Sequence, residues 1–165
     1  MKRPQRVPPG PGQASVWDYP RPPRLEPFRG HIEVIFNGRT ILETERAYRA
    51  LETSHPPTYY LPMGDVAEGV LVPSRRTSRC EWKGQASYFH VRVDDRQADD
   101  AAWTYPDPTP DFARIRDHVT FYPDPMDACY VDGERATPQP GRFYGGWITS
   151  DVVGPFKGEP GTRGW

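Results

Sequence analysis

Eight residues in separate blocks of this sequence have side chains that could carry chemistry. The candidates for acid–base or nucleophilic chemistry are Glu52, Lys83 and Cys80, and the candidates for ligand contacts are Tyr59, Tyr60, Asp65, Trp103 and Tyr105. A carboxylate and an ammonium among aromatic rings form the kind of pocket where pKa values shift and proton transfer becomes possible. We therefore expect Glu52 to serve as an acid, a base or a cation-binding group, and Lys83 to meet an anionic part of a ligand.

The same residues also have a purely structural interpretation. Glu52 and Lys83 could form an ion pair that closes a sheet, because structural ion-pair networks perturb pKa values too. The tyrosines and Trp103 could be core residues whose polar atoms reach the surface. Tyr59 and Tyr60 are adjacent, so in a strand one ring would enter the core and the other would be free for a pocket. The sequence leaves both interpretations open.

Cys80 is the candidate nucleophile, because a nearby Lys83 would stabilise its thiolate. His55 and His90 are the candidate bases, and one of them would have to lie within hydrogen-bond reach of the thiol. The alternative is a buried, inert thiol, which is common for a free cysteine. Cys129, in "DACYV", is expected to lie in the core.

Metal ligation is not predicted. The two cysteines form no CxxC pair, and the four histidines show no HxH or HExxH spacing. We therefore expect no structural zinc, no cofactor and two free thiols. The acidic pairs Asp94-Asp95 and Asp99-Asp100 flank a turn, where carboxylates mostly serve solvation and turn formation.

The composition excludes several classes of protein. The formal charge of -1, from 21 basic and 22 acidic side chains, argues against binding nucleic acid by neutralising phosphates. No apolar run is long enough to span a bilayer, and "MKRPQRVPPGPG" lacks the apolar centre of a signal peptide. We therefore expect a cytoplasmic protein without membrane contact. A length of 165 residues predicts one domain with extensions, and 21 prolines with 15 glycines predict many turns.

The first half of the domain has clear local signals. In "HIEVIFNGRTILET" apolar residues alternate before Asn37-Gly38, which supplies the positive φ angles of a tight hairpin turn. The spacing of small and apolar residues in "TERAYRALE" predicts a helix over 44–52, which Pro56-Pro57 would end. "TYYLP" is then expected to form a short strand.

Further strands and a second helix are predicted in the second half. "ASYFHVRV" alternates between two faces, and shorter strands are expected near 77–80, 101–105, 119–122 and 126–131. A short helix is expected within 109–119, with Phe112, Ile115 and Val119 inward. The sequence therefore predicts a mainly β fold of antiparallel sheets with two short helices.

Proline-rich and glycine-rich segments flank this domain. Residues 1–29 are expected to form an extended arm, loose at its start, that docks through Trp17 and Tyr19. Residues 134–165 are rich in glycine and aromatic residues and are expected to pack over the domain at 30–133.

Four blocks in order, "GRTILETERAYRALETSHPPTYYLPMGDV", "TSRCEWKGQASYFHV", "AAWTYPDPTP" and "HVTFYPDPMDACYVDG", resemble domain-of-unknown-function family 427, a bacterial family sometimes labelled nucleotidyltransferase-like. "SVWDYPRPPRLEP" and "FYGGWITSDVVGPFKG" resemble the flanking segments of its longer members. The resemblance implies a β-tent fold similar to Mss4, in which two small sheets lean together over a pocket. Zinc-binding relatives of that fold use paired CxxC motifs, which this sequence lacks.

Three functions compete on these grounds. The first is the binding or transformation of a small molecule in a cleft between the sheets. The second is a non-enzymatic interaction module that uses exposed aromatic residues and the proline-rich arm. The third, nucleotidyl transfer, would require several carboxylates to converge on one point.

Overall fold

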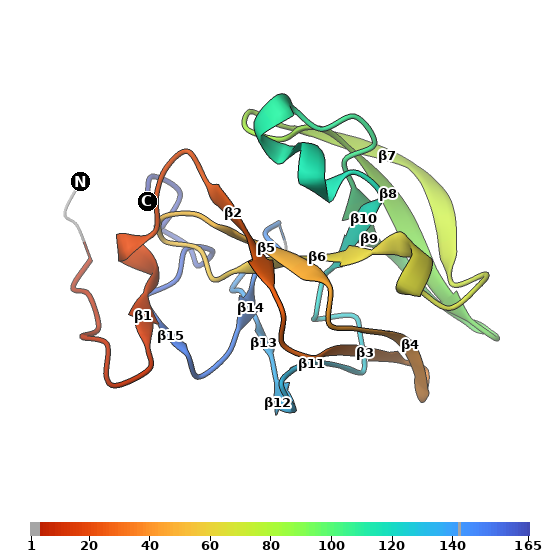
Figure 1. Ribbon diagram of the computed structural model, residues 1–165, viewed down its shortest axis with the longest axis horizontal. Helices are drawn as coiled ribbons and strands as arrows, with labels where there is room; N and C mark the ends of the chain where they lie inside the picture. The colour runs from red at the N-terminus through yellow and green to blue at the C-terminus, as the bar shows by residue number, and fades with distance from the viewer. Residues whose placement is uncertain (1–3, 142) are drawn as a thin grey trace.

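The computed structural model describes residues 4–141 and 143–165, and the chain in these ranges is built mainly of β-strands (Figure 1). Its helical segments are all 3₁₀, and no α-helix occurs in the described ranges. The elements, in chain order, are β1 (Ala14–Ser15), η1 (Val16–Asp18), β2 (Arg24–Phe28), β3 (Ile32–Phe36), β4 (Arg39–Thr44), β5 (Ala47–Leu51), β6 (Thr58–Pro62), η2 (Met63–Asp65), β7 (Leu71–Cys80), β8 (Gly84–Val93), β9 (Arg96–Thr104), η3 (Pro110–Ile115), β10 (His118–Phe121), β11 (Ala128–Val131), β12 (Glu134–Arg135), β13 (Thr137–Pro138), β14 (Trp147–Ile148) and β15 (Val152–Val153).

The predicted hairpin is present as β3 and β4. Its turn residues Asn37 and Gly38 have φ angles of 50° and 73°, as a two-residue turn between twisted strands requires. Ile32, Val34 and Phe36 are fully buried, so the alternation in the sequence marks the inward face of β3.

The helix predicted over 44–52 is wrong. Ala47–Leu51 instead forms β5, which pairs antiparallel with β2 on one side and β6 on the other. Helix propensity is a weak preference even for alanine and leucine, and hydrogen bonding to two neighbouring strands overrides it. The second predicted helix is present as η3, and its Phe112 and Ile115 point inward as expected.

Two antiparallel sheets form the body of the protein. The larger has seven strands in the order β2-β5-β6-β10-β9-β8-β7, and the smaller has four in the order β12-β11-β3-β4. The larger sheet ends at β2 and at the long strand β7, and each of these edge strands contains a proline, Pro27 and Pro73. The register of β7 against β8 shifts between Pro73 and Thr77, so this edge carries a bulge.

The apolar core lies between these two sheets, and a second cluster covers the opposite face of the larger one. The core contains Val34 and Phe36 from the small sheet together with Tyr59 and Val91 from the large sheet. The second cluster contains Tyr60 and is covered by η3. The adjacent tyrosines therefore face opposite sides of β6, as the sequence predicts for a strand.

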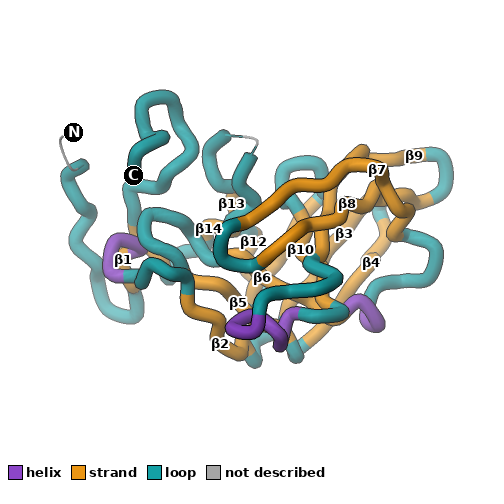
Figure 2. The backbone as a smooth tube through the Cα atoms, turned by 90° about the horizontal axis from the view of Figure 1, so that it is seen from above, coloured by secondary structure: helices purple, strands orange, loops and turns teal. Residues whose placement is uncertain are grey.

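The arm and the C-terminal segment pair with each other. β1 lies parallel to β15, and the Trp17 indole N–H donates to the Pro155 carbonyl at 2.9 Å. Figure 2 shows the loops of both segments gathered on one side of the molecule, away from β7, β8 and β9. The last residues of the expected arm form β2 of the large sheet. The expected loose start of the arm falls partly on residues 1–3, which lie outside the described ranges.

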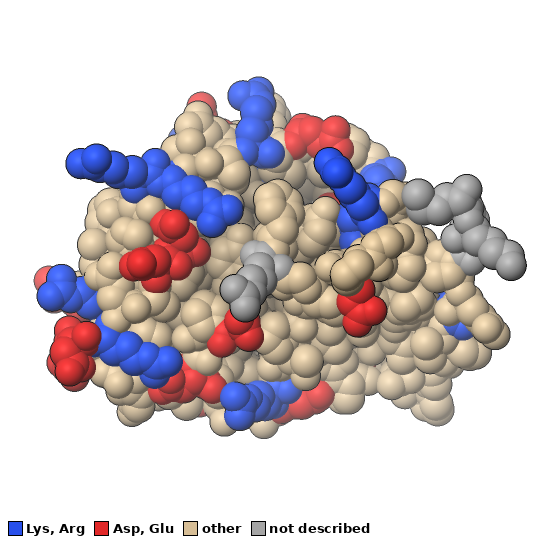
Figure 3. Space-filling model, turned by 180° about the vertical axis from the view of Figure 1, so that it is seen from behind, with Lys and Arg blue, Asp and Glu red and all other residues tan. Residues whose placement is uncertain are grey.

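Charges of both signs are spread over the surface. The face in Figure 3 carries lysines and arginines beside aspartates and glutamates, with neither sign dominant. No helix in the described ranges is long and apolar enough to cross a bilayer.

Candidate functional site

A pocket of about 430 Å³ lies on the face of the large sheet that carries the second cluster, opposite the small sheet. One wall comes from the ends of β5 and β6, and another from β7, β8 and the turn that joins them. The segment after β13 forms the third wall, through residues 139, 143–145 and 157. Trp103, Tyr105 and Tyr122 complete the lining, so the pocket is built by several parts of the chain that are far apart in sequence.

Six of the eight predicted site residues meet in this pocket: Glu52, Lys83, Cys80, Tyr60, Trp103 and Tyr105. Tyr59 does not, because it lies on the other face of β6 in the core, where its hydroxyl is buried without a hydrogen-bond partner among the described residues. Asp65 also lies elsewhere, in a 2.8 Å ion pair with Arg46.

Lys83 is a nearly buried cation surrounded by rings. Its exposed fraction is 9%, and its Nζ lies 5.8 Å from the Tyr60 ring centroid, 5.9 Å from that of Tyr105 and 5.8 Å from that of Phe112. Among the described residues its ammonium has no ion-pair or hydrogen-bond partner, and Glu52 contacts Arg21 and His55 instead. The ion pair that the sequence allowed between Glu52 and Lys83 therefore does not form.

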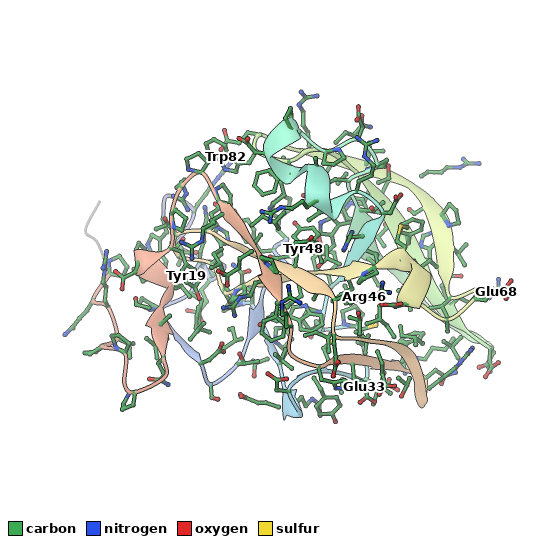
Figure 4. All side chains as sticks on the ribbon, viewed as in Figure 1. Tyr19, Glu33, Arg46, Tyr48, Glu68 and Trp82 are labelled. Atoms are coloured by element: carbon green, nitrogen blue, oxygen red, sulfur yellow. The ribbon has the colours of Figure 1, made fainter. Side chains whose placement is uncertain are left out.

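The turn between β7 and β8 holds Lys83 in this position. Thr109 donates its hydroxyl to the Trp82 carbonyl at 2.6 Å and its backbone N–H to the Lys83 carbonyl at 3.1 Å. Gly84 follows with φ of 107°, a conformation that other residues adopt only with strain. Figure 4 shows Trp82 at the end of the molecule that also holds η3. The backbone of the lysine is thus fixed from both sides.

Glu52 is held by two positively polarised groups. Its Oε2 lies 3.3 Å from Arg21 Nη2 and 3.4 Å from His55 Nε2. Arg21 also donates to the Thr53 carbonyl at 2.8 Å, which orients its guanidinium. Three-quarters of the Glu52 side chain is buried, so the carboxylate has a defined position at the wall of the pocket.

The hydrogen bonds of Gln139 fix the tautomer of His55. The Gln139 amide oxygen accepts from the Gly146 N–H at 3.1 Å, and its nitrogen donates to the Lys157 carbonyl at 2.8 Å. The same nitrogen lies 3.0 Å from His55 Nδ1, so its second hydrogen must be donated to that atom. His55 is therefore the neutral tautomer with its proton on Nε2, where it faces the Glu52 carboxylate.

The electrostatics of the pocket support this assignment. Burial lowers the pKa of His55 to about 3, and the positive charges of Lys157, Arg21 and Lys83 contribute to that shift. Burial is the larger cause, and the cations add to it. The pocket lining carries three basic side chains, Arg79, Lys83 and Lys157, beside two acidic ones, Glu52 and Glu81.

Two tyrosines offer neutral hydroxyls near Lys83. Burial raises the pKa of Tyr60 well above its ordinary value, and the charges of Cys80 and Glu52 raise it further. Burial also raises the pKa of Tyr105, and Tyr60 adds to that effect while Lys83 opposes it. Both phenols stay protonated at neutral pH, so they can donate hydrogen bonds to an anion.

The two thiols have different surroundings. Both cysteines are free, as predicted. Cys80 is half-buried and lines the pocket, as does His55, one of its candidate bases. His90, the other candidate, accepts from the Asp100 N–H at 3.1 Å on another part of β8. Cys129 lies in the core as expected, and burial there raises the pKa of its thiol.

The acidic pairs lie outside the pocket. Asp94 and Asp95 form the turn between β8 and β9, whereas Asp99 and Asp100 lie within β9. Within residues 4–141 and 143–165, no three histidine, cysteine or acidic side chains are grouped so that they could hold a metal ion.

Several pocket residues are not predicted by the sequence. Gln139, Phe143, Tyr144 and Lys157 come from the C-terminal segment, and Arg21, which pairs with the lining residue Glu52, comes from the arm. The one sequence signal for them is the aromatic and glycine-rich run "FYGGW", which indicates packing rather than a site. Nothing in the sequence shows which face this run covers.

Comparison with known proteins gives one result. No curated protein matches the chain. A family model described as a domain of unknown function, DUF427, matches residues 24–132, which extend from β2 through β11 and include Glu52, Cys80 and Lys83. Arg21 and the third wall of the pocket lie outside the matched range. The match covers more than half of the chain, so this protein belongs to the DUF427 family.

Proposed function

We propose that the pocket binds a small anionic molecule whose acidic group is held by Lys83. The observation that carries this proposal is the Lys83 side chain, which is 9% exposed and whose ammonium faces three aromatic rings with no ion-pair partner among the described residues. A buried charge is costly unless it is paired, and ring faces compensate an ammonium only in part. An anionic ligand would supply the missing partner.

The other charges of the pocket favour the same ligand. Arg79 and Lys157 also line it, beside the acidic Glu52 and Glu81, and Arg21 pairs with Glu52. A volume of about 430 Å³ lies within the usual range for small-molecule sites, roughly 300–1,000 Å³. The protonated hydroxyls of Tyr60 and Tyr105 would add hydrogen bonds to the anion.

Transformation of the ligand, beyond binding it, would rest on Glu52. Its carboxylate is held at the pocket wall, with His55 Nε2 3.4 Å from Oε2. At this wall of the pocket Glu52 would accept or return a proton of the bound molecule, as a general base or acid does. Cys80 is the alternative reactive group, because it lines the same pocket. Nucleotidyl transfer has no comparable support, because the acidic pairs do not converge there.

We also propose that the fold is of the β-tent, Mss4-like type. Two antiparallel sheets enclose one core, and the large sheet contributes strands from both of its halves to the pocket walls. The pairing of two sheets over one core supports the arrangement that the family resemblance implies, whereas the pocket lies on the outer face of the large sheet and not in the expected cleft between the sheets.

The first experiment measures ligand-induced stabilisation. Wild-type protein, Lys83→Met and Arg46→Gln are heated with a series of carboxylates, phosphates and neutral analogues. Methionine keeps most of the apolar stem of lysine without the charge, and Arg46 is an exposed control paired with Asp65. A ligand at 100 times its Kd stabilises the folded state by about 2.7 kcal/mol, so we expect several anions to raise the Tm of wild type and Arg46→Gln.

The loss of anion-induced stabilisation that we expect in Lys83→Met separates the competing functions. Stabilisation by anions but not by neutral analogues, absent in Lys83→Met, agrees with the proposal. A wild-type protein that no anion in the series stabilises would contradict it and would favour the interaction module. Equal stabilisation of wild type and Lys83→Met would show that the anions bind elsewhere.

A further inference from the structure

The structure points to an aromatic anion as the ligand of this pocket, with Phe143 as the residue that selects for its planar part. This inference rests on the proposed function, because it takes the acidic group to lie at Lys83. It assigns a role to the C-terminal segment, which lies outside the DUF427 match.

Phe143 is the most exposed large apolar side chain in the described ranges. Two-thirds of it, 67%, is accessible to water, although it lines the pocket. Burying a phenylalanine side chain is favourable, so a ligand that covers this exposed ring gains the free energy of removing it from water. A ligand with a flat apolar face would cover the ring.

Two contacts with other lining residues of the pocket fix the backbone around Phe143. The Tyr122 hydroxyl donates to the Phe143 carbonyl at 3.1 Å. Two residues later, Gly145 sits so close to the Trp103 indole that an added Cβ would be 2.2 Å from its Cη2. The exposed ring is thus presented by an anchored segment.

Ring contacts continue from Phe143 toward the charged end of the pocket. The Phe143 and Tyr144 rings meet edge-on with centroids 5.0 Å apart, and Tyr144 meets the His55 ring at 4.7 Å. The Lys157 ammonium lies 5.4 Å from the Tyr144 ring. On the side of the β7–β8 turn, Trp82 adds a partly exposed ring to the lining.

This combination favours a planar aromatic group over an aliphatic one. Aromatic pairs gain more than the area they bury, because ring quadrupoles attract in offset and edge-on arrangements. A flat anion with its acid at Lys83 can place its rings against Phe143 and Trp82. A saturated group of equal size would keep the apolar contact and lose the ring interactions.

The test compares two carboxylates that differ only in aromaticity. Binding of 2-naphthoate and of its saturated counterpart, decahydro-2-naphthoate, is measured by calorimetry with full-length wild type, Phe143→Ala, Lys83→Met and Val7→Ala. Val7 is the matched control, because it is the other exposed large apolar residue, at 47%, and is not part of the pocket lining.

We expect wild type and Val7→Ala to bind 2-naphthoate about two- to tenfold more tightly than the saturated acid. Phe143→Ala should weaken binding of the saturated acid through the lost apolar contact, and weaken binding of 2-naphthoate about two- to tenfold more, so that the preference disappears. Lys83→Met should bind both acids at least about tenfold more weakly, because it lacks the charged partner.

Each departure from this pattern contradicts a defined part of the argument. One such result is that Lys83→Met binds both acids more weakly while Phe143→Ala still prefers 2-naphthoate. That result overturns the role of Phe143 and leaves anion binding at Lys83 intact. An equal loss for both acids in Phe143→Ala overturns the aromatic assignment. Unchanged affinities in Lys83→Met overturn the proposed function itself. If wild type binds neither acid at up to about 10 mM, the aromatic assignment fails, and the stabilisation series with carboxylates and phosphates decides the proposed function separately.

Discussion

At the scale of a single residue, the lowered pKa of His55 makes the stability of the folded protein depend on pH. Burial and nearby cations lower its pKa to about 3, whereas in the unfolded chain a histidine titrates near 6.5. Below about pH 6.5 the unfolded state therefore binds a proton that the folded state excludes. The contribution of His55 to the free energy of unfolding is therefore fully present above about pH 6.5. It is lost as the pH falls from about 6.5 toward 3.

We predict that His55→Asn reduces this pH dependence. Asparagine is chosen because its carbonyl oxygen can accept from Gln139 in place of Nδ1. Between pH 6 and pH 4, the free energy of unfolding of wild type should fall relative to the variant by about 1.4 kcal/mol per pH unit. Urea denaturation at a series of pH values measures this difference, and parallel curves would contradict the neutral tautomer.

The sequence predicts which residues meet in the pocket better than it predicts their contacts. Glu52, Lys83 and Tyr60 can be identified because the prolines and glycines beside them restrict the chain, and charged groups and rings held in this way are typical of a site. The partner of Glu52 cannot be identified, because Arg21 comes from the arm and its approach depends on the docking of that whole segment. Tyr59 and Tyr60 can be assigned to opposite faces, but no local signal shows which face holds the pocket.

At the scale of elements, the segment after β13 is the part whose packing shapes the site. Gly145 has no room for a side chain, because an added Cβ would be 2.2 Å from Trp103 Cη2. We predict that Gly145→Ala lowers the free energy of unfolding by about 1–3 kcal/mol, since overpacking forces the segment off the indole. Urea denaturation with Trp fluorescence would report both the stability and the disturbed indole.

Gly64→Ala is the control for this substitution. An added Cβ at Gly64 meets nothing within 4 Å, so the free energy of unfolding should change by no more than about 0.5 kcal/mol. If both variants are equally stable, the segment does not rest on Trp103.

The elements themselves are predictable to differing degrees. The β3–β4 hairpin follows from Asn37-Gly38 and the alternation before it, which are local signals. β5 is not predicted, because the spacing of its small and apolar residues also fits a helix. This segment is a strand because it pairs with β2 on one side and β6 on the other. β1 and β15 cannot be predicted as a pair, since the contacts between them join residues more than a hundred positions apart.

At the scale of the whole molecule, the sequence predicts that the arm docks through Trp17 and Tyr19. It does not predict that the arm docks on the C-terminal segment. Trp17 carries this docking, through the hydrogen bond to Pro155 and an edge-on contact with Trp165 at 5.4 Å between ring centroids. We predict that Trp17→Ala lowers the free energy of unfolding by about 1–3 kcal/mol, because this half-buried ring and its hydrogen bond are lost together. Denaturant titration measures the change.

Trp17→Phe separates the two contributions, because phenylalanine keeps a ring but cannot donate to Pro155. We expect it to retain most of the stability of wild type. A Trp17→Ala variant as stable as wild type would show that the arm adds nothing to the folded domain.

The two edge strands of the large sheet also affect how molecules behave toward each other. An open edge with free backbone groups can recruit a strand from another chain, which is how edge-to-edge association and fibrils begin. β2 and β7 each contain a proline, which lacks an N–H, and β7 adds a bulge and the exposed Arg75, Arg76 and Arg79. Strands with these features are poor templates, so concentrated solutions of this β-rich protein should remain free of fibrils.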